Sequence, residues 1–572
     1  MSYKKQNFVD NQILTADNLN HIEDGISNIE ESTNILYSMG LKFDGTDTEE
    51  DIRFVLQNLP KDITNIKFPR NIDINLSSTL VLPSNVSIDF SGSTFYLPTN
   101  LKFDGICVLN STNIKISNLN LIELEHDYAA IGDGLTIINC QGVILDNINI
   151  SGFYSGISID DENFISQNIN ITNCITRYCK LYGLNLGYCK DVHVHSHISE
   201  YCYLDGIKLC RKCYNVNVMS GFSSYNGVSY PTYNGNGIDL YAGGNNVIVS
   251  GLICIGNGGT GIYIKSGDLN YEDSHYIENI MINNCICKEN ECDGLQITSQ
   301  FTESSLYLPT NININGGLYI NNKGNGVYVK GKYINISNAN ISKNSSIGLN
   351  IMEGYSINVT NVAINVNGNS DNYGKAINIA SSNDININGC NMDGIYSNNK
   401  EVPDSMLPSY DNCIRISESD NIIITNCIFK NYDSSSPVGY TNYSTINENV
   451  QVKIDYGNNI KTLSGIGSVG STMILGNKLY TKLTPVNVVT GWVENKNSFK
   501  TSKIYNGDGT TKIYTIDHNL GKVPTMVLVT KEHNDMLGND FIVTKNATSI
   551  IIILKDPVPA GTNNVRFSIY AE

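Results

Sequence analysis

The side chains of this chain that could do chemistry stand in a repeated sequence word of the form Gly, apolar, variable, apolar. The variable position holds Lys208, Asp239 and Tyr263 in three consecutive copies, "GIKL", "GIDL" and "GIYI". Asp205 directly precedes the Gly of its own copy. Glycoside hydrolysis needs two carboxyl groups, one protonated and one ionised, and Lys208 beside Asp239 would keep that carboxylate ionised. We therefore take Asp239, Asp205 and Lys208 as the leading catalytic candidates.

Their spacing can be estimated if the copies stack as strands. Asp205 and Asp239 are then one coil and three residues apart, so their backbones lie roughly 11 Å apart. Side chains that lean together could reach the roughly 6.5–9.5 Å of an inverting pair. The alternative interpretation is a surface column of mixed polar residues, with Asp239–Lys208 an exposed ion pair of little energetic weight.

Rival acidic positions exist. The word "DDEN" supplies Asp160, Asp161 and Glu162, and Asp293 precedes the Gly of a later copy. If the leading candidates are not catalytic, we expect the site at one of these carboxylates.

Residues near the candidate carboxylates could bind sugars. Sugar rings have apolar faces that stack on aromatic side chains, while their hydroxyl groups need carboxylates and amides. The variable positions and their neighbours, together with two inserted loops, supply a set of expected substrate-binding residues: Tyr241, Tyr263, Lys265, Gln296, Tyr328, Tyr230 and Tyr233.

The elements that position these residues are short strands. The word occurs twelve times, at Gly105, Gly134, Gly156, Gly183, Gly206, Gly237, Gly261, Gly294, Gly326, Gly348, Ala376 and Cys413. Runs in which apolar residues alternate, broken by Gly and Asn turns, are typical of strands. A repeat as short as about two dozen residues predicts one coil of a right-handed parallel β-helix, in which each strand pairs with its equivalent one coil along.

Composition excludes several classes of function. With 38 Lys and Arg against 55 Asp and Glu, the net charge of −17 argues against a nucleic-acid partner. No apolar run is long enough for membrane insertion, and the first residues lack the apolar segment of a signal peptide. Of the 15 cysteines, Cys140, Cys174, Cys285, Cys390 and Cys427 follow Asn or Gly at strand ends in words such as "ITNCI", which indicates reduced thiols in a core. We therefore expect a chain folded in the host cytoplasm.

Metal and cofactor sites are not expected. Cys210 and Cys213 form a single CxxC without a second pair at zinc spacing. His193, His195 and His197 alternate on one strand and so share a face, which we expect to be solvated.

Three segments carry family resemblances. The segment "LKFDGTDTEEDIRFVLQNLP", followed by "STLVLPSNVSIDF", resembles the start of pectate-lyase-like tailspike β-helices, where a short helix caps the first coil. The words "FVDNQILTADNLNHIEDGI" resemble the N-terminal segment of tail fibre and baseplate proteins from phages of Gram-positive bacteria. "DHNLGKVPTMVLVT" resembles a C-terminal module of such tail proteins, where it serves as a trimer cap or a sugar-binding knob.

A further resemblance extends to residues that build the coils but not to most of the residues that carry out catalysis. The words "NGNGIDL", "GTGIYIKSG", "CDGLQITS" and "NGVYVK" resemble successive coils of polygalacturonase-type glycosidases. Of that family's chemical residues, Asp239 and Lys330 are retained, whereas Gly259 and Thr260 replace its paired aspartates. That catalytic mechanism therefore does not transfer.

These observations predict five segments. Residues 1–40 are predicted to form a particle-attachment segment with a trimeric helix, because Leu19, Ile22, Ile26 and Ile29 lie in a heptad pattern. The alternative interpretation of this pattern is one amphipathic helix packed on its own chain. Residues 41–104 hold a capping helix and the first strands. Residues 105–450 form the β-helix, 451–500 a neck, and 501–572 a β-sandwich.

The resemblances imply a homotrimeric phage tailspike, located in the virion tail and attached to a tail or baseplate protein through its N-terminus. It would recognise a host cell-surface polysaccharide and hydrolyse it, since lyase chemistry on a uronate polymer fits an acidic chain less well. Two alternatives stay open: a non-catalytic receptor-binding protein of the same architecture, and a bacterial carbohydrate-active protein.

Overall fold

The protein is described by a computed structural model, in which the chain divides into two units, residues 1–450 and 451–572. The described residues of the first unit are 35–42, 46–68, 72–98, 102–124, 131–228, 234–267, 277–299, 307–365, 367–368, 375–393, 413–425, 427–430 and 438–440. Those of the second unit are 454–456, 472–475, 478–482, 492–494, 499–508, 510–517, 523–524, 527–531, 541–546, 549–558 and 560–571.

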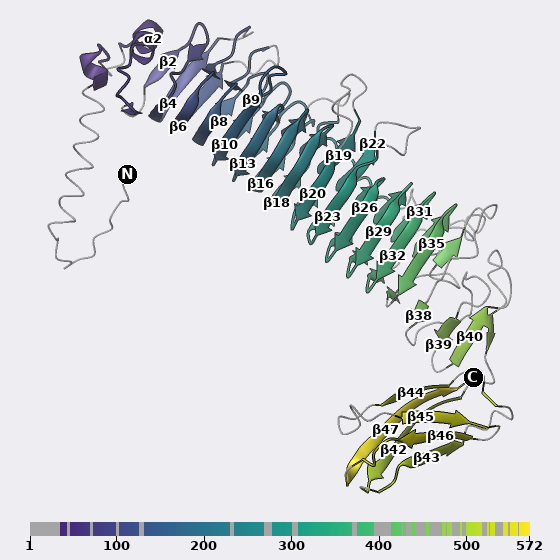
Figure 1. Ribbon diagram of the computed structural model, residues 1–572. Coiled ribbons are helices and arrows are strands. Elements are labelled where there is room, and N and C mark those ends of the chain that lie inside the picture. Colours follow the sequence, from purple (N-terminus) through teal and green to yellow (C-terminus); the bar gives the residue numbers. More distant parts are fainter. Residues whose placement is uncertain are drawn as a thin grey trace, which may run out of the picture. The chain divides into compact units, whose positions relative to one another are not determined.

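One side of the first unit is a parallel sheet of 14 strands, called the repeat sheet below, whose strands lie one behind the other (Figure 1). Its strands are β3 (Leu80–Val81), β5 (Ile106–Leu109), β7 (Leu135–Ile138), β9 (Ile157–Ile159), β12 (Leu184–Leu186), β15 (Ile207–Cys210), β17 (Ile238–Tyr241), β19 (Ile262–Ser266), β22 (Leu295–Ser299), β25 (Val327–Val329), β28 (Leu349–Met352), β31 (Ile377–Ala380), β34 (Ile414–Ser417) and β37 (Val438–Tyr440). All twelve copies of the repeated word form strands of this sheet, so the predicted parallel β-helix is confirmed.

The other two sides of each coil belong to a second parallel sheet of 23 strands. Its strands are β1 (Asn65–Lys67), β2 (Asp73–Asn75), β4 (Ser87–Leu97), β6 (Thr112–Glu123), β8 (Gln141–Ser151), β10 (Ser166–Thr172), β11 (Ile175–Arg177), β13 (Cys189–His195), β14 (Ile198–Glu200), β16 (Cys213–Ser224), β18 (Gly244–Ile255), β20 (Glu278–Asn283), β21 (Ile286–Lys288), β23 (Thr310–Asn315), β24 (Leu318–Ile320), β26 (Lys332–Ser337), β27 (Asn340–Ser342), β29 (Tyr355–Thr360), β30 (Ala363–Asn365), β32 (Asn383–Asn388), β33 (Asn391–Asp393), β35 (Asp420–Thr425) and β36 (Ile428–Lys430). The long strand β16 pairs with β13 through its first half and with β14 through its second half, so one coil has three sides.

The repeated Gly is required by close packing across the coil. A Cβ at Gly261 would lie 2.8 Å from Cys287 Cβ and 2.9 Å from Asn290 Nδ2. Real Cβ atoms do not approach other atoms so closely, so the strand start must be Gly wherever the opposite side of the coil carries these side chains.

A ladder of buried asparagines runs through the interior, and its members are Asn226, Asn257, Asn290, Asn322, Asn344 and Asn367. In each step, the backbone N–H and Nδ2 of one Asn donate to Oδ1 of the next, as from Asn290 to Asn322 at 3.1 and 2.9 Å. The ladder satisfies turn amides that would otherwise be buried without partners.

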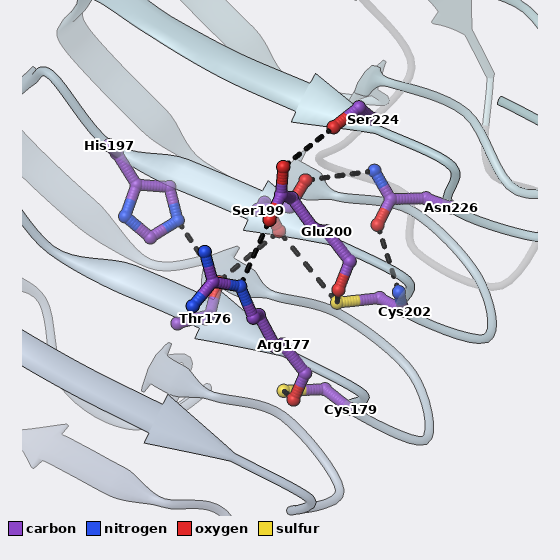
Figure 2. A network of polar contacts seen from close by, with 9 residues as sticks. All are labelled: Thr176, Arg177, Cys179, His197, Ser199, Glu200, Cys202, Ser224 and Asn226. Carbon is purple, nitrogen blue, oxygen red and sulfur yellow. Dashed lines mark hydrogen bonds and ion pairs between the residues drawn. The ribbon is translucent and has the colours of Figure 1, made fainter. Parts of the chain in front are cut away.

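Figure 2 shows the N-terminal end of this ladder, where Asn226 Oδ1 accepts a hydrogen bond from the backbone N–H of Cys202 at 3.0 Å. The buried His197 ring lies nearby, 3.2 Å from Thr176 Oγ1. The expectation that His193, His195 and His197 share one face is therefore wrong. Ser196 has φ 54° and turns the chain, so His197 enters the interior while the other two side chains stay exposed.

The N-terminal capping helix is α2 (Glu49–Gln57). Thr48 caps it, accepting from the backbone N–H of Asp51, and the Asp51 carboxylate accepts in turn from the Thr48 N–H. Ile52, Val55 and Leu56 are its buried face. Of the helix expected before it, residues 35–38 are helical and the remainder lies outside the described residues.

The described residues of the second unit form three small sheets. Strands β38 (Ile454–Tyr456), β39 (Thr472–Leu475), β40 (Lys478–Lys482) and β41 (Trp492–Glu494) form the first. Two antiparallel three-stranded sheets follow: β42 (Phe499–Gly507), β47 (Gly561–Ala571) and β44 (Val527–Lys531), and β43 (Ile513–Asp517), β46 (Ser549–Leu554) and β45 (Phe541–Lys545). Residues of both, such as Ile552 and Phe567, share one core, as in a β-sandwich.

Candidate functional site

The variable positions of the repeated word form one column along the repeat sheet. Lys208 pairs with Asp239, and Asp239 pairs with Tyr263, each on the next coil. The column continues through Gln296 and Tyr328. The predicted adjacency of these side chains is thus confirmed, because in-register parallel strands place equivalent residues side by side.

The Lys208 and Asp239 side chains form a buried ion pair. The Lys208 ammonium bonds Asp239 Oδ2 and lies 3.6 Å from Asp205 Oδ2. The side chains of Lys208 and Asp239 are 11% and 4% exposed, so the interpretation as an exposed surface pair is wrong. Burial opposes the charge of Lys208, but the carboxylates of Asp239 and Asp205 outweigh burial and raise its pKa.

Asp205 is held by Asn236, whose backbone N–H and Nδ2 donate to Asp205 Oδ1 at 2.8 and 2.9 Å. Burial raises the pKa of Asp205 to about 6, against the influence of Lys208. Asp239 Oδ1 is buried and has no hydrogen-bond partner among the described residues. The cluster therefore contains one carboxyl group that binds a proton readily and one that pairs with an ammonium.

The separation of this pair differs from the expected one. Because one ammonium contacts an oxygen of Asp205 at 3.6 Å and also bonds Asp239, these two oxygens lie closer together than the roughly 6.5–9.5 Å of an inverting pair. Retaining enzymes hold their carboxyl groups roughly 5–5.5 Å apart, a separation that lies within the limit set by these two contacts.

A pocket of about 410 Å³ opens on the outer side of the repeat sheet next to this cluster. Its lining residues come from five successive coils: Asp133, Tyr154, Ser155, Ser158, Asp160, Leu181, Tyr182, Asn185, Lys208, Cys210, Arg211 and Tyr241. Asp205 and Asp239 are not among them, so they contact the pocket through Lys208.

Asp160 is the rival carboxylate that reaches the pocket. Asn185 Nδ2 donates to its Oδ2 at 3.3 Å. Burial raises the pKa of Asp160, and the Arg211 guanidinium opposes this. Asp161 and Glu162 are not lining residues of the pocket. Asp161 Oδ1 accepts from the backbone N–H of Asn163 at 2.9 Å, and Glu162 is exposed.

Asp133 is a pocket carboxylate that the sequence interpretation missed. Its Oδ1 accepts from the backbone N–H of Ser155 at 2.9 Å. Burial, followed by the nearby Asp104 carboxylate, raises its pKa to about 6. The signal was available, since Asp133 directly precedes a repeat Gly, as Asp205 and Asp293 do. Asp133 and Asp160 are one coil and five residues apart, roughly 17 Å between backbones on strand geometry, which is too far for a hydrolytic pair.

The expected sugar-binding residues divide into three groups. The Tyr241 ring lines the pocket, with the ammonium groups of Lys208 and Lys265 each 4.6 Å from its centroid. Tyr263, Lys265, Gln296 and Tyr328 are half-buried and follow on the next coils, beyond the pocket lining. Tyr230 and Tyr233 lie outside the described residues.

Asp293 also stands apart from the pocket. Its Oδ1 accepts hydrogen bonds from the backbone N–H and Nδ2 of Asn325. Burial raises its pKa to about 6.

The described part of the chain lacks two kinds of feature. Within it, no group of three or more His, Cys, Asp or Glu side chains could hold a metal ion. Nor does any helix there have the length and apolar character needed to cross a bilayer.

Comparison with known proteins agrees with the fold. The family model described as "Right handed beta helix region" matches residues 104–272, which include every residue of the pocket, and the chain forms a right-handed parallel β-helix. No curated protein sequence matches the chain.

Similar solved structures include phage tailspikes and an epimerase. The Dettilon tailspike protein is 12% identical, over 93% of this chain and 92% of that one, with a TM-score of 0.41. The tailspike protein of E. coli bacteriophage HK620, in complex with a pentasaccharide, is 10% identical over 93% and 90%, with a TM-score of 0.38. The A-module of the Azotobacter vinelandii mannuronan C-5 epimerase AlgE4 is 14% identical over 72% and 99%, with a TM-score of 0.39.

Proposed function

We propose that this chain is a tailspike-type receptor-binding protein that binds a host cell-surface polysaccharide in the pocket on its repeat sheet. The pocket carries this proposal: its volume of about 410 Å³ lies in the range of small-ligand sites. Three tyrosines, Tyr154, Tyr182 and Tyr241, offer ring faces, and Asp133 and Asp160 offer acceptors for hydroxyl groups. The N-terminal resemblance supports attachment to a tail or baseplate particle and assembly as a homotrimer.

Hydrolysis of the bound polysaccharide is the second part of the proposal. Asp205 and Asp239 meet on one ammonium at a spacing that suits a retaining pair, and the raised pKa of Asp205 suits a proton donor. Both carboxyl groups lie behind Lys208, so Lys208 would have to move when substrate binds. Asp160, which lines the pocket itself, is the rival catalytic carboxylate.

Binding is tested with fluorescently labelled protein on a panel of Gram-positive cells, before and after periodate oxidation of their surface sugars. Tyr182→Ala should reduce decoration at least tenfold. Tyr355→Ala is the matched control, since Tyr355 is 38% exposed and lies outside the pocket lining. Protein that decorates no strain, or that decorates oxidised cells equally well, contradicts the proposal.

Hydrolysis is tested on the polysaccharide of a decorated strain, by assaying new reducing ends and the ultraviolet absorbance of an unsaturated product. We expect reducing ends without absorbance, and we expect Asp239→Asn to abolish them while binding persists. If cleavage survives in Asp239→Asn but not in Asp160→Asn, the site is at Asp160. If neither signal appears on decorated strains, the protein is purely adhesive.

A further inference from the structure

The carboxyl groups of the pocket differ in whether a cation pairs with them. Four of them, those of Asp133, Asp160, Asp205 and Asp239, lie in or directly behind the pocket. The ammonium groups of Lys180 and Lys265 lie over the rings of Tyr154 and Tyr241. Two cations line the pocket itself. Lys208 is one cation, and it is shared by Asp205 and Asp239. Arg211 is the other, and its guanidinium acts on Asp160.

Asp133 is the carboxylate left over. No Lys, Arg or His of the described residues lies within ion-pair distance of it, and the charged neighbour that acts on its pKa has the same sign. That neighbour is Asp104, whose Oδ1 accepts from the backbone N–H of Asp133 at 2.9 Å.

The surroundings of Asp133 suit a cation that is carried on a sugar ring. Tyr154 and Tyr182 line the same pocket, and aromatic faces attract cations as well as the apolar faces of sugars. The Lys180 and Lys208 ammonium groups already lie 5.6 and 5.7 Å from the centroids of these rings, so a ligand ammonium would bind at the Asp133 carboxylate itself. A neutral or anionic sugar would cover the Asp133 carboxylate without matching its charge, and burying an unpaired charge is costly. A sugar with an ammonium group would supply the missing partner.

Resting on the proposed function, we propose that the pocket selects a saccharide unit with a free amine, and that Asp133 binds the ammonium group of this unit. Asp133 is in this view a specificity-determining residue. The ligand class is an amino sugar whose nitrogen is not acetylated.

The inference is tested with two oligosaccharides of equal length, glucosamine oligomers with free amines and their fully N-acetylated counterparts. Affinities are measured by titration calorimetry at a pH at which most of the amines are protonated. We expect the free-amine oligomer to bind the unmodified protein at least tenfold more tightly, a comparison that needs no variant.

Two charge-matched variants locate the effect. Asp133→Asn should weaken binding of the free-amine oligomer about tenfold and leave the acetylated one unchanged. Glu278→Gln removes the same charge at an exposed position outside the pocket lining and should change neither. Equal affinities for the two oligomers, an equal effect of both variants, or no binding of either oligomer would overturn the inference. If the protein still decorates cells in those cases, the proposed function survives and only the amine selectivity fails.

Discussion

Lys208 and Asp239 are bonded to each other across neighbouring coils, and both side chains are buried. Removing one partner of a buried ion pair leaves an uncompensated charge, which typically costs about 3–5 kcal/mol. We therefore expect Lys208→Met to lower the free energy of unfolding by that amount. The double variant Lys208→Met/Asp239→Asn should lose less, and a double-mutant cycle in chemical denaturation measures the coupling.

Lys323 and Glu291 give the exposed control for this pair, since their side chains are 66% and 47% exposed. Lys323→Met should change stability by less than about 1 kcal/mol. Equal losses in Lys208→Met and Lys323→Met would show that burial does not determine the strength of the pair.

The buried Asp293 predicts a pH dependence of stability. Its pKa is raised to about 6 by burial, so the folded state holds this proton more tightly than the unfolded state does. The penalty of burying the charge is present above pH 6 and is relieved as the pH falls from about 6 towards 4, by about 3 kcal/mol at most. Asp293→Asn should therefore be more stable than the unmodified protein at pH 7.5, and the difference should shrink to about a third near pH 4.5. A difference in unfolding midpoint that is constant between these pH values would contradict the assignment.

The interior asparagine ladder predicts a contrast between two Asn→Ala variants. Asn290→Ala leaves the backbone N–H and Nδ2 of Asn257 without their shared acceptor inside the coil. Each buried unsatisfied group costs about 1–3 kcal/mol, so we expect a loss of about 2–6 kcal/mol in thermal or chemical unfolding. Asn335→Ala removes a member of an exposed ladder, where water replaces the lost bonds, and should cost less than about 1 kcal/mol. Similar losses at the two positions would rule out this role for the interior ladder.

The glycine at position 187 is predicted to set the position of Asp160. A Cβ added there would overlap Asp160 Oδ1, which lies at the free end of a side chain and can move. Gly187→Ala should therefore weaken polysaccharide binding several-fold, with an unfolding midpoint close to that of the unmodified protein. Gly244→Ala is the control, because its Cβ would lie 3.8 Å from Val247 Cγ2, an ordinary contact. Unchanged binding in Gly187→Ala would argue against a role for Asp160 in the pocket.

Much of the fold could be predicted because its signals are local. The alternation of Ile, Leu and Val indicates which residues face inwards, and the repeated Gly indicates where each strand of the repeat sheet begins. Once the copies are aligned, the neighbours of Asp239 follow from the register, and the structure confirms Lys208 and Tyr263 in those places.

The candidate site could be predicted less completely from the sequence than the fold. Asp133 carries the same signal as Asp205, a position directly before a repeat Gly, but the pocket exists only where side chains of five coils leave a space. No single coil contains that information. The Asp205–Asp239 separation likewise depends on Lys208 reaching both carboxylates, which strand spacing alone does not specify.

The sequence by itself determined the strands, the stacking of coils and the order of side chains in each column, because alternation and turn residues act over a few positions. Only the tertiary structure decided which outward-facing positions are buried, as Lys208 and Asp239 are, and where a single left-handed residue such as Ser196 redirects His197 into the interior. Burial and pocket shape depend on atoms from neighbouring coils and from opposite sides of one coil. Those atoms are brought together by the completed fold, which no local pattern encodes.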